Sequence, residues 1–383
     1  MSTVQQASQK GNSYRFMFPF VGDGLISGSG KRHKLYRKIF SRVVNGGLVR
    51  DCVGVVDRLS KILVDKLRVL ADGRNIDILE TLEGCTVDII CEIVMGCTDI
   101  NAQDNPDQDF IMYKIFMARV MKIWLQPDFV HKLTHQYEKQ CQVVRVIHNF
   151  IEKLNNFGHG GNSILEKILE TNDASHELTD DEIRDQMFLM YLASQDTMSV
   201  TCCFMTLMLA MHEDVQKKCR QEIQDVLNDG ETITTASLDR LKYLEMTVKE
   251  TFRLFPIAPF IMRRLTGELR LDTCTLPAGC EVMIASYIVN RSDRYWRNPE
   301  QFDPERFSSE ESSTRHAYAY VPFSCGPMGC IGRHFAMMCL KTIMANLLRS
   351  YRITTHVRME DLKLTFDTVI RSMDGYKVSL DKK

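Results

Sequence analysis

The sequence predicts a mainly α-helical protein with a small β region, built as a single domain. Apolar residues recur every three to four positions over most of the chain, which is the spacing of one helix face. Short stretches typical of strands occur only after about position 259, bounded by Gly, Pro, Asn or Asp. No internal repeat or low-complexity tract divides the chain. These three observations favour packed helices with a late β region.

Helical periodicity occurs in a series of long stretches. The longest opens at Thr179, and Glu182 completes the pattern of a capping box. Its apolar part, 187–211, carries Gln195 and Asp196 in the middle, so we expect a buried core helix rather than a membrane span. The expected helices cover 33–45, 48–71, 76–97, 107–125, 132–156, 161–171, 180–211, 212–228, 238–255 and 331–350.

Strands are expected near 259–264, 269–272 and 281–286 and in the last two dozen residues. The segment 276–279, with its Pro and Gly, is typical of a turn joining two of them. The Gly-rich run 157–163 is interpreted as a surface loop between two helices, because the composition is similar on both sides.

Composition narrows the class of protein. A hydrophobic content of 44% supports a large packed core. The formal net charge of −1 gives no reason to expect nucleic acid as a partner. The 13 cysteines are odd in number and often lie in apolar helical stretches, as at Cys91, Cys202, Cys203 and Cys339. Buried thiols in a reducing compartment are therefore favoured over a disulfide framework.

The segment 321–336 is the most informative part of the chain. A Gly- and Pro-rich loop ends at Cys330, and an apolar helix follows directly. Gly326, Gly329 and Gly332 allow the backbone to lie close to a flat group. The free N–H groups and dipole of the new helix favour a thiolate and lower its pKa. Alternatives are a structural buried cysteine, or a zinc site that uses Cys325, Cys330, His334 and Cys339.

The pattern of Phe323, Gly326, Cys330 and Gly332 resembles the haem-binding signature of the cytochromes P450. The resemblance implies that Cys330 is the metal ligand of heme b (iron protoporphyrin IX) and that Phe323, Gly326 and Gly332 shape the cofactor site. The family usually has Arg or His two residues before the cysteine, to pair with a haem propionate, and this chain has Met328.

Glu250 and Arg253 lie at positions i and i+3 of an expected helix and share one face. By themselves they could form an ordinary surface pair. Together with Arg306 they are similar to the Glu-Arg-Arg cluster of the same family, which implies a structural brace for the cysteine loop rather than a catalytic site.

The stretch from Ala193 to Thr197 is similar to the family's oxygen-binding stretch, which implies that Thr197 and Asp196 are catalytic and deliver protons. Asp and Thr side chains that compete for backbone hydrogen bonds are expected to open the helix locally. A satisfied polar pair in the core is the alternative. Ser194 stands where the family usually has Gly.

The segment 22–38 resembles the approach to the family's Trp-x-x-x-Arg helix. Arg37 matches the propionate-binding arginine, while His33 replaces the tryptophan. Arg263, at the start of a strand, matches another propionate ligand. The alternative for both arginines is a solvated surface charge.

The resemblance extends from about position 22 to the end and is closest to the branch called family 4. It implies the cytochrome P450 fold, with a haem domain over 22–383 and an unassigned segment over 1–21. The family's membrane anchor and first sheet strands would lie before the start of this chain. Many members of the branch esterify haem through a glutamate, where this chain has Ala193, so non-covalent haem is expected apart from the Cys330–iron bond.

The implied function is a monooxygenase that inserts one atom of O₂ into an apolar substrate, such as a fatty acid, a hormone-like lipid or a xenobiotic. The implied partners are NADPH-cytochrome P450 reductase and, as an optional second electron donor, cytochrome b5, on the cytosolic face of the endoplasmic reticulum membrane. Arg333, His334 and Lys341 are candidates for the positive docking surface, and an ordinary solvated helix face is the alternative. Two alternatives stay open: a degenerate haem-binding protein without turnover, and a helical interaction protein without haem.

Overall fold

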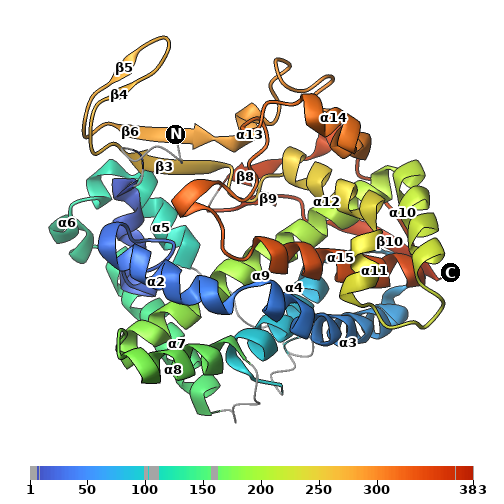
Figure 1. The fold of residues 1–383 in the computed structure, drawn as a ribbon, viewed down its shortest axis with the longest axis horizontal. Helices are drawn as coiled ribbons and strands as arrows, with labels where there is room; N and C mark the ends of the chain where they lie inside the picture. The colour runs from blue at the N-terminus through green and yellow to red at the C-terminus, as the bar shows by residue number, and fades with distance from the viewer. Residues whose placement is uncertain are drawn as a thin grey trace.

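The structure is a computed structural model that describes residues 7, 9–98, 102, 112–156, 163–366 and 368–382. Helices dominate it, and the strands lie in separate small sheets (Figure 1). The helices are α1 (Phe18–Val21), α2 (Gly30–Val43), α3 (Gly46–Leu70), α4 (Leu79–Ile90), α5 (Met112–Met121), α6 (Asp128–Lys132), α7 (His135–Asn156), α8 (Ile164–Ser175), α9 (Asp180–Met211), α10 (Glu213–Val226), α11 (Thr235–Arg240), α12 (Lys242–Leu254), α13 (Ser286–Val289), α14 (Ser309–Thr314) and α15 (Arg333–Ser350).

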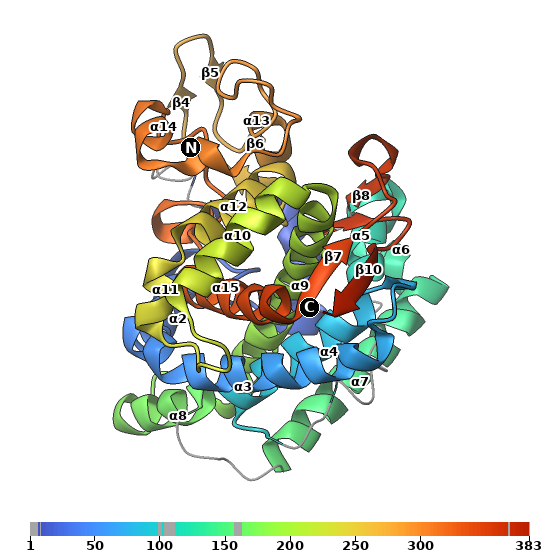
Figure 2. The same cartoon turned by 90° about the vertical axis from the view of Figure 1, so that its right-hand side faces the viewer.

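Helices α9 and α15 form the centre of the molecule. Helix α15 packs on α3, α9, α10 and α12 (Figure 2). Helix α9 opens with the expected capping box of Thr179 and Glu182 and is buried over almost all of its second half. The expectation of a core helix at 187–211 is therefore confirmed. Within the described residues, no helix has both the length and the apolar character needed to cross a bilayer.

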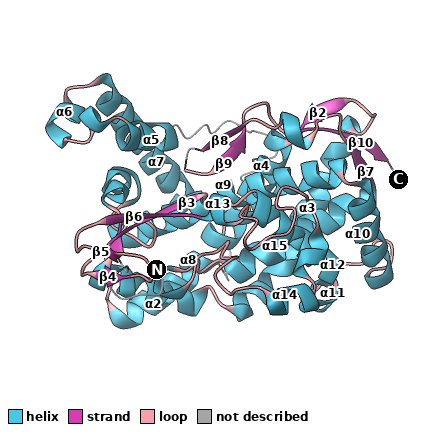
Figure 3. Ribbon diagram, turned by 90° about the horizontal axis from the view of Figure 1, so that it is seen from above, coloured by secondary structure: helices cyan, strands magenta, loops and turns pink. Residues whose placement is uncertain are grey.

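The strands of the described residues form four small sheets at the edges of the helical body (Figure 3). In the first, β3 (Phe260–Arg264) lies between β1 (Gln9–Lys10) and β6 (Glu281–Ala285), and all pairs are antiparallel. In the second, β10 (Lys377–Lys382) lies between β2 (Asn75–Asp77) and β7 (Tyr351–Thr354). Two hairpins complete the set: β4 (Leu269–Arg270) with β5 (Thr275–Leu276), and β8 (Leu364–Phe366) with β9 (Ile370–Ser372).

Most expected elements are present, with differences at several boundaries. The stretch 238–255 is two helices, because Leu241 leaves the helical region with a ψ of 75°. The stretch 76–97 is interrupted: a short strand comes first, and α4 passes into a π-helical turn at Cys91–Met95. The short helices α6 and α14 and the strand β5 were not expected. Residues 107–111 of one expected helix, and 157–162 of the expected loop, lie outside the described residues.

Candidate active site

The loop before α15 is held by its own backbone. The Ser324 N–H donates to the Val321 carbonyl, and the Cys330 N–H donates to the Phe323 carbonyl at 2.8 Å. Ser324 has a φ of 57°, and Gly326 has a φ of 68°. A positive φ is strained for a side chain such as serine and free of strain for glycine. The loop is therefore a defined turn that fixes where Cys330 lies.

Close approach explains one of the other two glycines of the loop. A Cβ at Gly329 would lie 3.2 Å from the carbonyl oxygen of Gly326, which is backbone and cannot yield easily. A Cβ at Gly332 would lie 3.9 Å from the sulfur of Cys330, which is an ordinary van der Waals contact. The steric argument therefore applies to Gly329, while Gly332 lies next to the sulfur without being required by space.

Cys330 is solvent-exposed, yet enough protein surrounds its sulfur to change the pKa of the thiol. Burial raises the pKa of the thiol, while a hydrogen bond from the Gly332 N–H and the charge of Arg37 act in the opposite direction. The expectation of a lowered thiol pKa is therefore wrong in its net direction, because burial is the larger effect. The two groups that favour the thiolate are nevertheless in place beside it.

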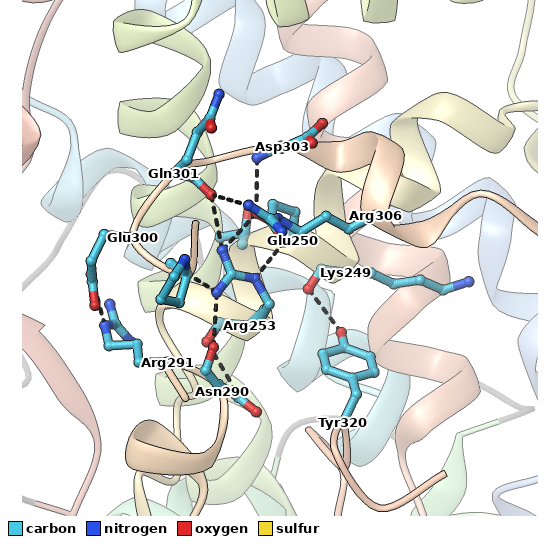
Figure 4. Close-up of polar contacts among 12 residues, drawn as sticks. Lys249, Glu250, Arg253, Asn290, Arg291, Glu300, Gln301, Asp303, Arg306 and Tyr320 are labelled. Carbon is cyan, nitrogen blue, oxygen red and sulfur yellow. Dashed lines mark hydrogen bonds and ion pairs between the residues drawn. The ribbon is translucent and has the colours of Figure 1, made fainter. Parts of the chain in front are cut away.

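Glu250, Arg253 and Arg306 form one ionic cluster (Figure 4). Arg253 pairs with Glu250 through both carboxylate oxygens, at 2.7 and 2.8 Å. Glu250 also accepts from the Asp303 N–H at 2.8 Å and lies 3.4 Å from Nε of Arg306. Burial raises the pKa of Glu250, and Arg253 is the largest opposing influence. The remaining guanidinium hydrogens of Arg253 are donated to the carbonyls of Asn290, Pro299 and Gln301.

Two contacts join this ionic cluster to the cysteine loop. The Tyr320 hydroxyl donates to the Lys249 carbonyl at 2.8 Å, next to Glu250 on α12. The rings of Phe252 and Phe323 meet edge to face, with centroids 5.1 Å apart. Helix α12 therefore carries the ion pair on one turn and holds both the approach to the loop and Phe323 of the motif.

The polar residues of α9 have separate surroundings. The Thr197 hydroxyl donates to the Ala193 carbonyl at 2.7 Å within the helix. The carboxylate of Asp196, 2% exposed, forms an ion pair with Arg371 on β9, and its Oδ2 has no hydrogen-bond partner. Burial raises the pKa of Asp196, and Arg371 opposes that shift. The Gln195 amide donates to Glu83 of α4 at 2.7 Å.

The helix is not opened at this point. Helix α9 is continuous from Asp180 to Met211, so the expected local opening is wrong. The physical reason is that the Asp196 side chain leaves the helix for Arg371 instead of competing for its backbone. Thr197 bonds to the Ala193 carbonyl one turn back, and α9 stays one continuous helix around this contact.

Arg37 and Arg263 converge on the cysteine loop from two elements. Arg37 of α2 donates from Nη1 to the Gly329 carbonyl at 2.6 Å. Arg263 of β3 is fully buried; its Nη1 donates to the Met262 carbonyl, while Nε and Nη2 have no partner. The alternative of solvated surface charges is therefore wrong for Arg263 and does not fit Arg37. His33 is buried, and burial with three neighbouring cations lowers its pKa to about 4.

These residues fit haem, the group that the resemblance implies. In the family that the sequence resembles, the haem iron takes a cysteine thiolate as ligand, and cations can pair with the two propionates. Cys330 is accessible, Gly332 leaves the sulfur uncrowded, and Arg263 has two buried guanidinium atoms without a partner. Zinc finds no such support, since the described His, Cys, Asp and Glu residues include no group of three able to hold a metal ion.

One residue that was expected at the surface is buried. Lys341 is 4% exposed and bonds to the Leu238 carbonyl and to Glu245, so it is wrong as part of a docking surface. Periodicity alone could not show this, because α11 covers that face of α15. Arg333 and His334 are exposed, as expected. Sequence reasoning also missed Arg371, whose only signal is a single charge beside apolar Ile370.

Comparison with known proteins gives consistent matches over nearly the whole chain. A family model described as Cytochrome P450 matches residues 4–380. Probable cytochrome P450 4aa1 of Drosophila melanogaster is 32% identical over 386 residues, 97% of this chain and 76% of that protein. Cytochrome P450 4V2 of Homo sapiens is 30% identical over 409 residues, 100% of this chain and 78% of that protein. Cytochrome P450 4c3 of Drosophila melanogaster is 28% identical over 410 residues, 98% and 76% respectively.

Proposed function

This chain belongs to the cytochrome P450 family of haem-thiolate monooxygenases, and from that premise we propose that it oxidises an apolar substrate, such as a fatty acid, a hormone-like lipid or a xenobiotic, with electrons from NADPH. Its nearest branch is family 4, as the motifs predicted. We assign residues 22–383 to the haem domain, to which α1 and β1 are also joined by contacts with α9 and β3.

The proposal rests on two features of the same site. Cys330 has an accessible thiol, and the buried guanidinium of Arg263 has two nitrogens without a hydrogen-bond partner. Cys330 offers sulfur to a metal, and Arg263 offers two free donors to a carboxylate. Haem is the cofactor of the family and has both an iron and two carboxylates. When bound, it supplies the chemistry by which one atom of O₂ enters the substrate and the other leaves as water.

The residues of this chain prepare that chemistry. The Gly332 N–H and Arg37 stabilise negative charge on the sulfur of Cys330. The cluster of Glu250, Arg253 and Arg306 keeps the loop in place through α12. These are positioning roles, since none of the three charges is directed at the thiol.

Proton delivery is assigned to α9. Asp196 has a raised pKa, so its carboxyl can hold a proton at higher pH than an ordinary aspartate does. Its Oδ2 is the atom free to receive that proton, because Oδ1 is engaged by Arg371. Thr197 follows directly in sequence, and its hydroxyl oxygen retains acceptor capacity while donating to the Ala193 carbonyl. We propose that the proton passes from Asp196 toward the oxygen site through Thr197.

Reduction is assigned to NADPH-cytochrome P450 reductase, with cytochrome b5 as a second donor, docking on the cysteine-loop side at the endoplasmic reticulum membrane. Arg333 and His334 are exposed at the start of α15 and supply positive charge there. The family generally uses reductase partners, and that general use supports the assignment.

The test is coupled turnover with purified reductase. We expect NADPH consumption, oxygen consumption and hydroxylated product in equal amounts with a suitable lipid panel. Thr197→Ala should keep haem and NADPH use but divert the electrons to peroxide, while Thr201→Ala, which removes a hydroxyl one turn further along α9, should stay coupled. Haem binding without product from any substrate, at full reduction by the reductase, would instead support a degenerate haem-binding protein. Met328, His33 and Ser194 are the residues that favour that second candidate.

A further inference from the structure

A cationic pocket lies where the segment after α13 meets α14 (Figure 1). Its volume is about 320 Å³, near the lower end of the roughly 300–1,000 Å³ that small-molecule pockets span. Four arginines line it, and among the described residues the carboxylate of Glu311 is the one negative group in its wall. None of the residues proposed to hold haem belongs to it. The arginines of the cationic pocket are Arg294, Arg297, Arg306 and Arg315.

Arginine side chains fix the backbone on both sides of this pocket. Arg306 belongs to the ionic cluster of the candidate active site and also lines the pocket (Figure 4). Its Nη2 donates to the Asn298 carbonyl at 2.8 Å, and its Nη1 donates to the Arg297 carbonyl. Arg315 in turn donates to the Arg306 carbonyl. The walls of the pocket are therefore held in place by the protein itself.

The positive charges of the pocket outnumber the carboxylates near them. Within the described part of the chain, three of the four arginines form no ion pair with a carboxylate: Arg294, Arg297 and Arg315. Burial lowers the pKa of Arg315, while Glu250 and Glu311 oppose that shift and Arg306 adds to it. If Glu250 is assigned to Arg306, 3.4 Å away, and Glu311 offsets one more cation of the four, two positive charges remain.

Trp296 adds a buried donor to the wall of the pocket. Its side chain is 2% exposed, and its indole Nε1 has no hydrogen-bond partner. The guanidinium carbon of Arg315 lies 4.2 Å from the centroid of the ring, and that of Arg253 lies 5.1 Å from it. A buried N–H without an acceptor carries a free-energy cost. An acceptor oxygen bound in the pocket is the partner that would remove this cost.

We propose that the cationic pocket binds a phosphate group, either as free inorganic phosphate or as the phosphate of a small organic monoester. A phosphate monoester carries close to two negative charges near pH 7 and has three strong acceptor oxygens, which match the surplus charge and the unused donor. Guanidinium groups pair with phosphate through two parallel hydrogen bonds. Tyr295 and His316 also line the pocket and offer ring surfaces to the organic part of a monoester.

The experiment is calorimetric titration of the full chain, with haem bound, at an ionic strength of roughly 0.15 M. The probes are inorganic phosphate and adenosine 5′-monophosphate. Arg294→Gln and Arg297→Gln remove the charge of exposed side chains, and Arg297→Lys keeps the charge without the paired hydrogen bonds. Arg270→Gln is the matched control, because it removes one exposed arginine on β4, outside the pocket. Melting temperatures without phosphate check that each variant is folded.

We expect wild type to bind one phosphate group per chain, with a Kd of about 1 mM or lower. Arg294→Gln and Arg297→Gln should each weaken binding about tenfold, the size of one lost charge-assisted hydrogen bond. Arg297→Lys should weaken it less, and Arg270→Gln should leave it unchanged. Phosphate should raise the melting temperature of wild type and of Arg270→Gln, because a ligand that binds the folded state stabilises it.

The two probes identify the source of the phosphate group. Tighter binding of adenosine 5′-monophosphate than of phosphate, weakened by the same variants, would identify an organic monoester as the ligand. Equal binding of the two would identify free phosphate. Both results support the inference.

Three results would overturn it. The first is the absence of saturable binding of either probe to wild type. The second is binding that Arg294→Gln and Arg297→Gln do not weaken, or that Arg270→Gln weakens equally, since phosphate would then respond only to the net charge of the surface. The third is unchanged phosphate binding with a weakened response to the reductase in the Arg294→Gln and Arg297→Gln proteins, which would show a protein-docking surface instead. All three leave the proposed function intact, because that function is tested by turnover and by the haem spectrum.

Discussion

Two arginines ten positions apart show opposite ways of burying a positive charge. Arg253 on α12 and Arg263 on β3 are both 0% exposed. Arg253 has a carboxylate partner in Glu250 and three carbonyl acceptors, so its hydrogen-bonding capacity is filled by the protein. Arg263 has one carbonyl acceptor, two unpartnered nitrogens and Lys10 across the strand.

The difference separates a structural cluster from a binding site. A buried ionic group that is complete within the chain stabilises a geometry, here the loop that carries Cys330. A buried cation whose donors have no acceptor stores a free-energy cost that a ligand of opposite charge relieves. The same residue type, at the same burial, therefore indicates scaffold in one place and cofactor site in the other.

The largest expected effect is on the complete cluster. Arg253→Met would leave Glu250 buried without its main partner, and breaking a buried pair typically costs about 3–5 kcal/mol. We expect a large loss of soluble, haem-loaded protein and a lower free energy of unfolding in urea. Arg270→Met is the control, because Arg270 pairs with Glu268 at an exposed site and should cost about 1 kcal/mol or less. A soluble, fully loaded Arg253→Met protein would contradict the structural role.

An intermediate effect is expected at the pair of Asp196 and Arg371. Arg371→Met would leave a buried carboxylate unpaired, at a cost of about 1–3 kcal/mol near neutral pH. The pKa of Asp196 is raised in the folded state, so folding binds a proton more tightly and stability falls as pH rises above the usual aspartate pKa of about 4. Loss of Arg371 raises that pKa further and should steepen the fall.

Urea unfolding between pH 4 and pH 8 measures this effect. Asp196→Asn should remove the part of the pH dependence of unfolding free energy that Arg371 controls. The double variant Asp196→Asn with Arg371→Met should therefore show the same pH dependence as Asp196→Asn alone. Equal pH slopes for wild type and Arg371→Met would show that the ion pair does not control the proton at Asp196.

A small effect of opposite sign is expected at Arg263. In the haem-free protein, Arg263→Met removes an unpartnered buried cation and relieves repulsion with Lys10, so stability should change by less than about 1 kcal/mol or increase. The loaded protein should lose haem faster. Melting curves of the haem-free and haem-loaded Arg263→Met proteins measure these changes in stability. If haem-free Arg263→Met lost as much stability as Arg253→Met, the distinction between the two arginines would be wrong.

The last prediction concerns covalent attachment of haem, of which we expect none. Ala193 lies one turn before Thr197 and has no carboxylate to esterify the cofactor. Acidified organic solvent should therefore extract all haem, and denaturing chromatography should leave none on the polypeptide. Ala193→Glu is the comparison, because it places a carboxylate at that position. Haem retained on the wild-type chain through denaturation would show a link that α9 does not explain.

The sequence predicted most of the helices, because they depend on local patterns, and local motifs also named the candidate site residues. Periodicity located α3, α9 and α15 within a few residues. The spacing of Glu250 and Arg253 placed them on one face of a helix, and the motif identified the loop of Cys330. These features are encoded within a turn or two of the chain.

The parts that the sequence could not predict depend on contacts between distant segments. Lys10 lies opposite Arg263 only because β1 pairs with β3, and Asp196 meets Arg371 only because the β8–β9 hairpin reaches α9. The rise in the thiol pKa of Cys330 has the same origin, since it comes from the protein packed around the loop. The burial of Lys341 could not be predicted for the same reason, since it depends on the contact between α11 and α15.

The most direct test of the account is the absorption spectrum of the reduced, CO-bound protein. We expect wild type to give the spectrum of a thiolate-ligated haem, which only a metal-bound Cys330 can supply here. Cys330→Ala should lose that spectrum entirely, while Cys325→Ala, five positions earlier in the same loop, should keep it. A thiolate-type spectrum that survives Cys330→Ala and disappears in Cys325→Ala would contradict the assignment of the ligand and of the site built around it.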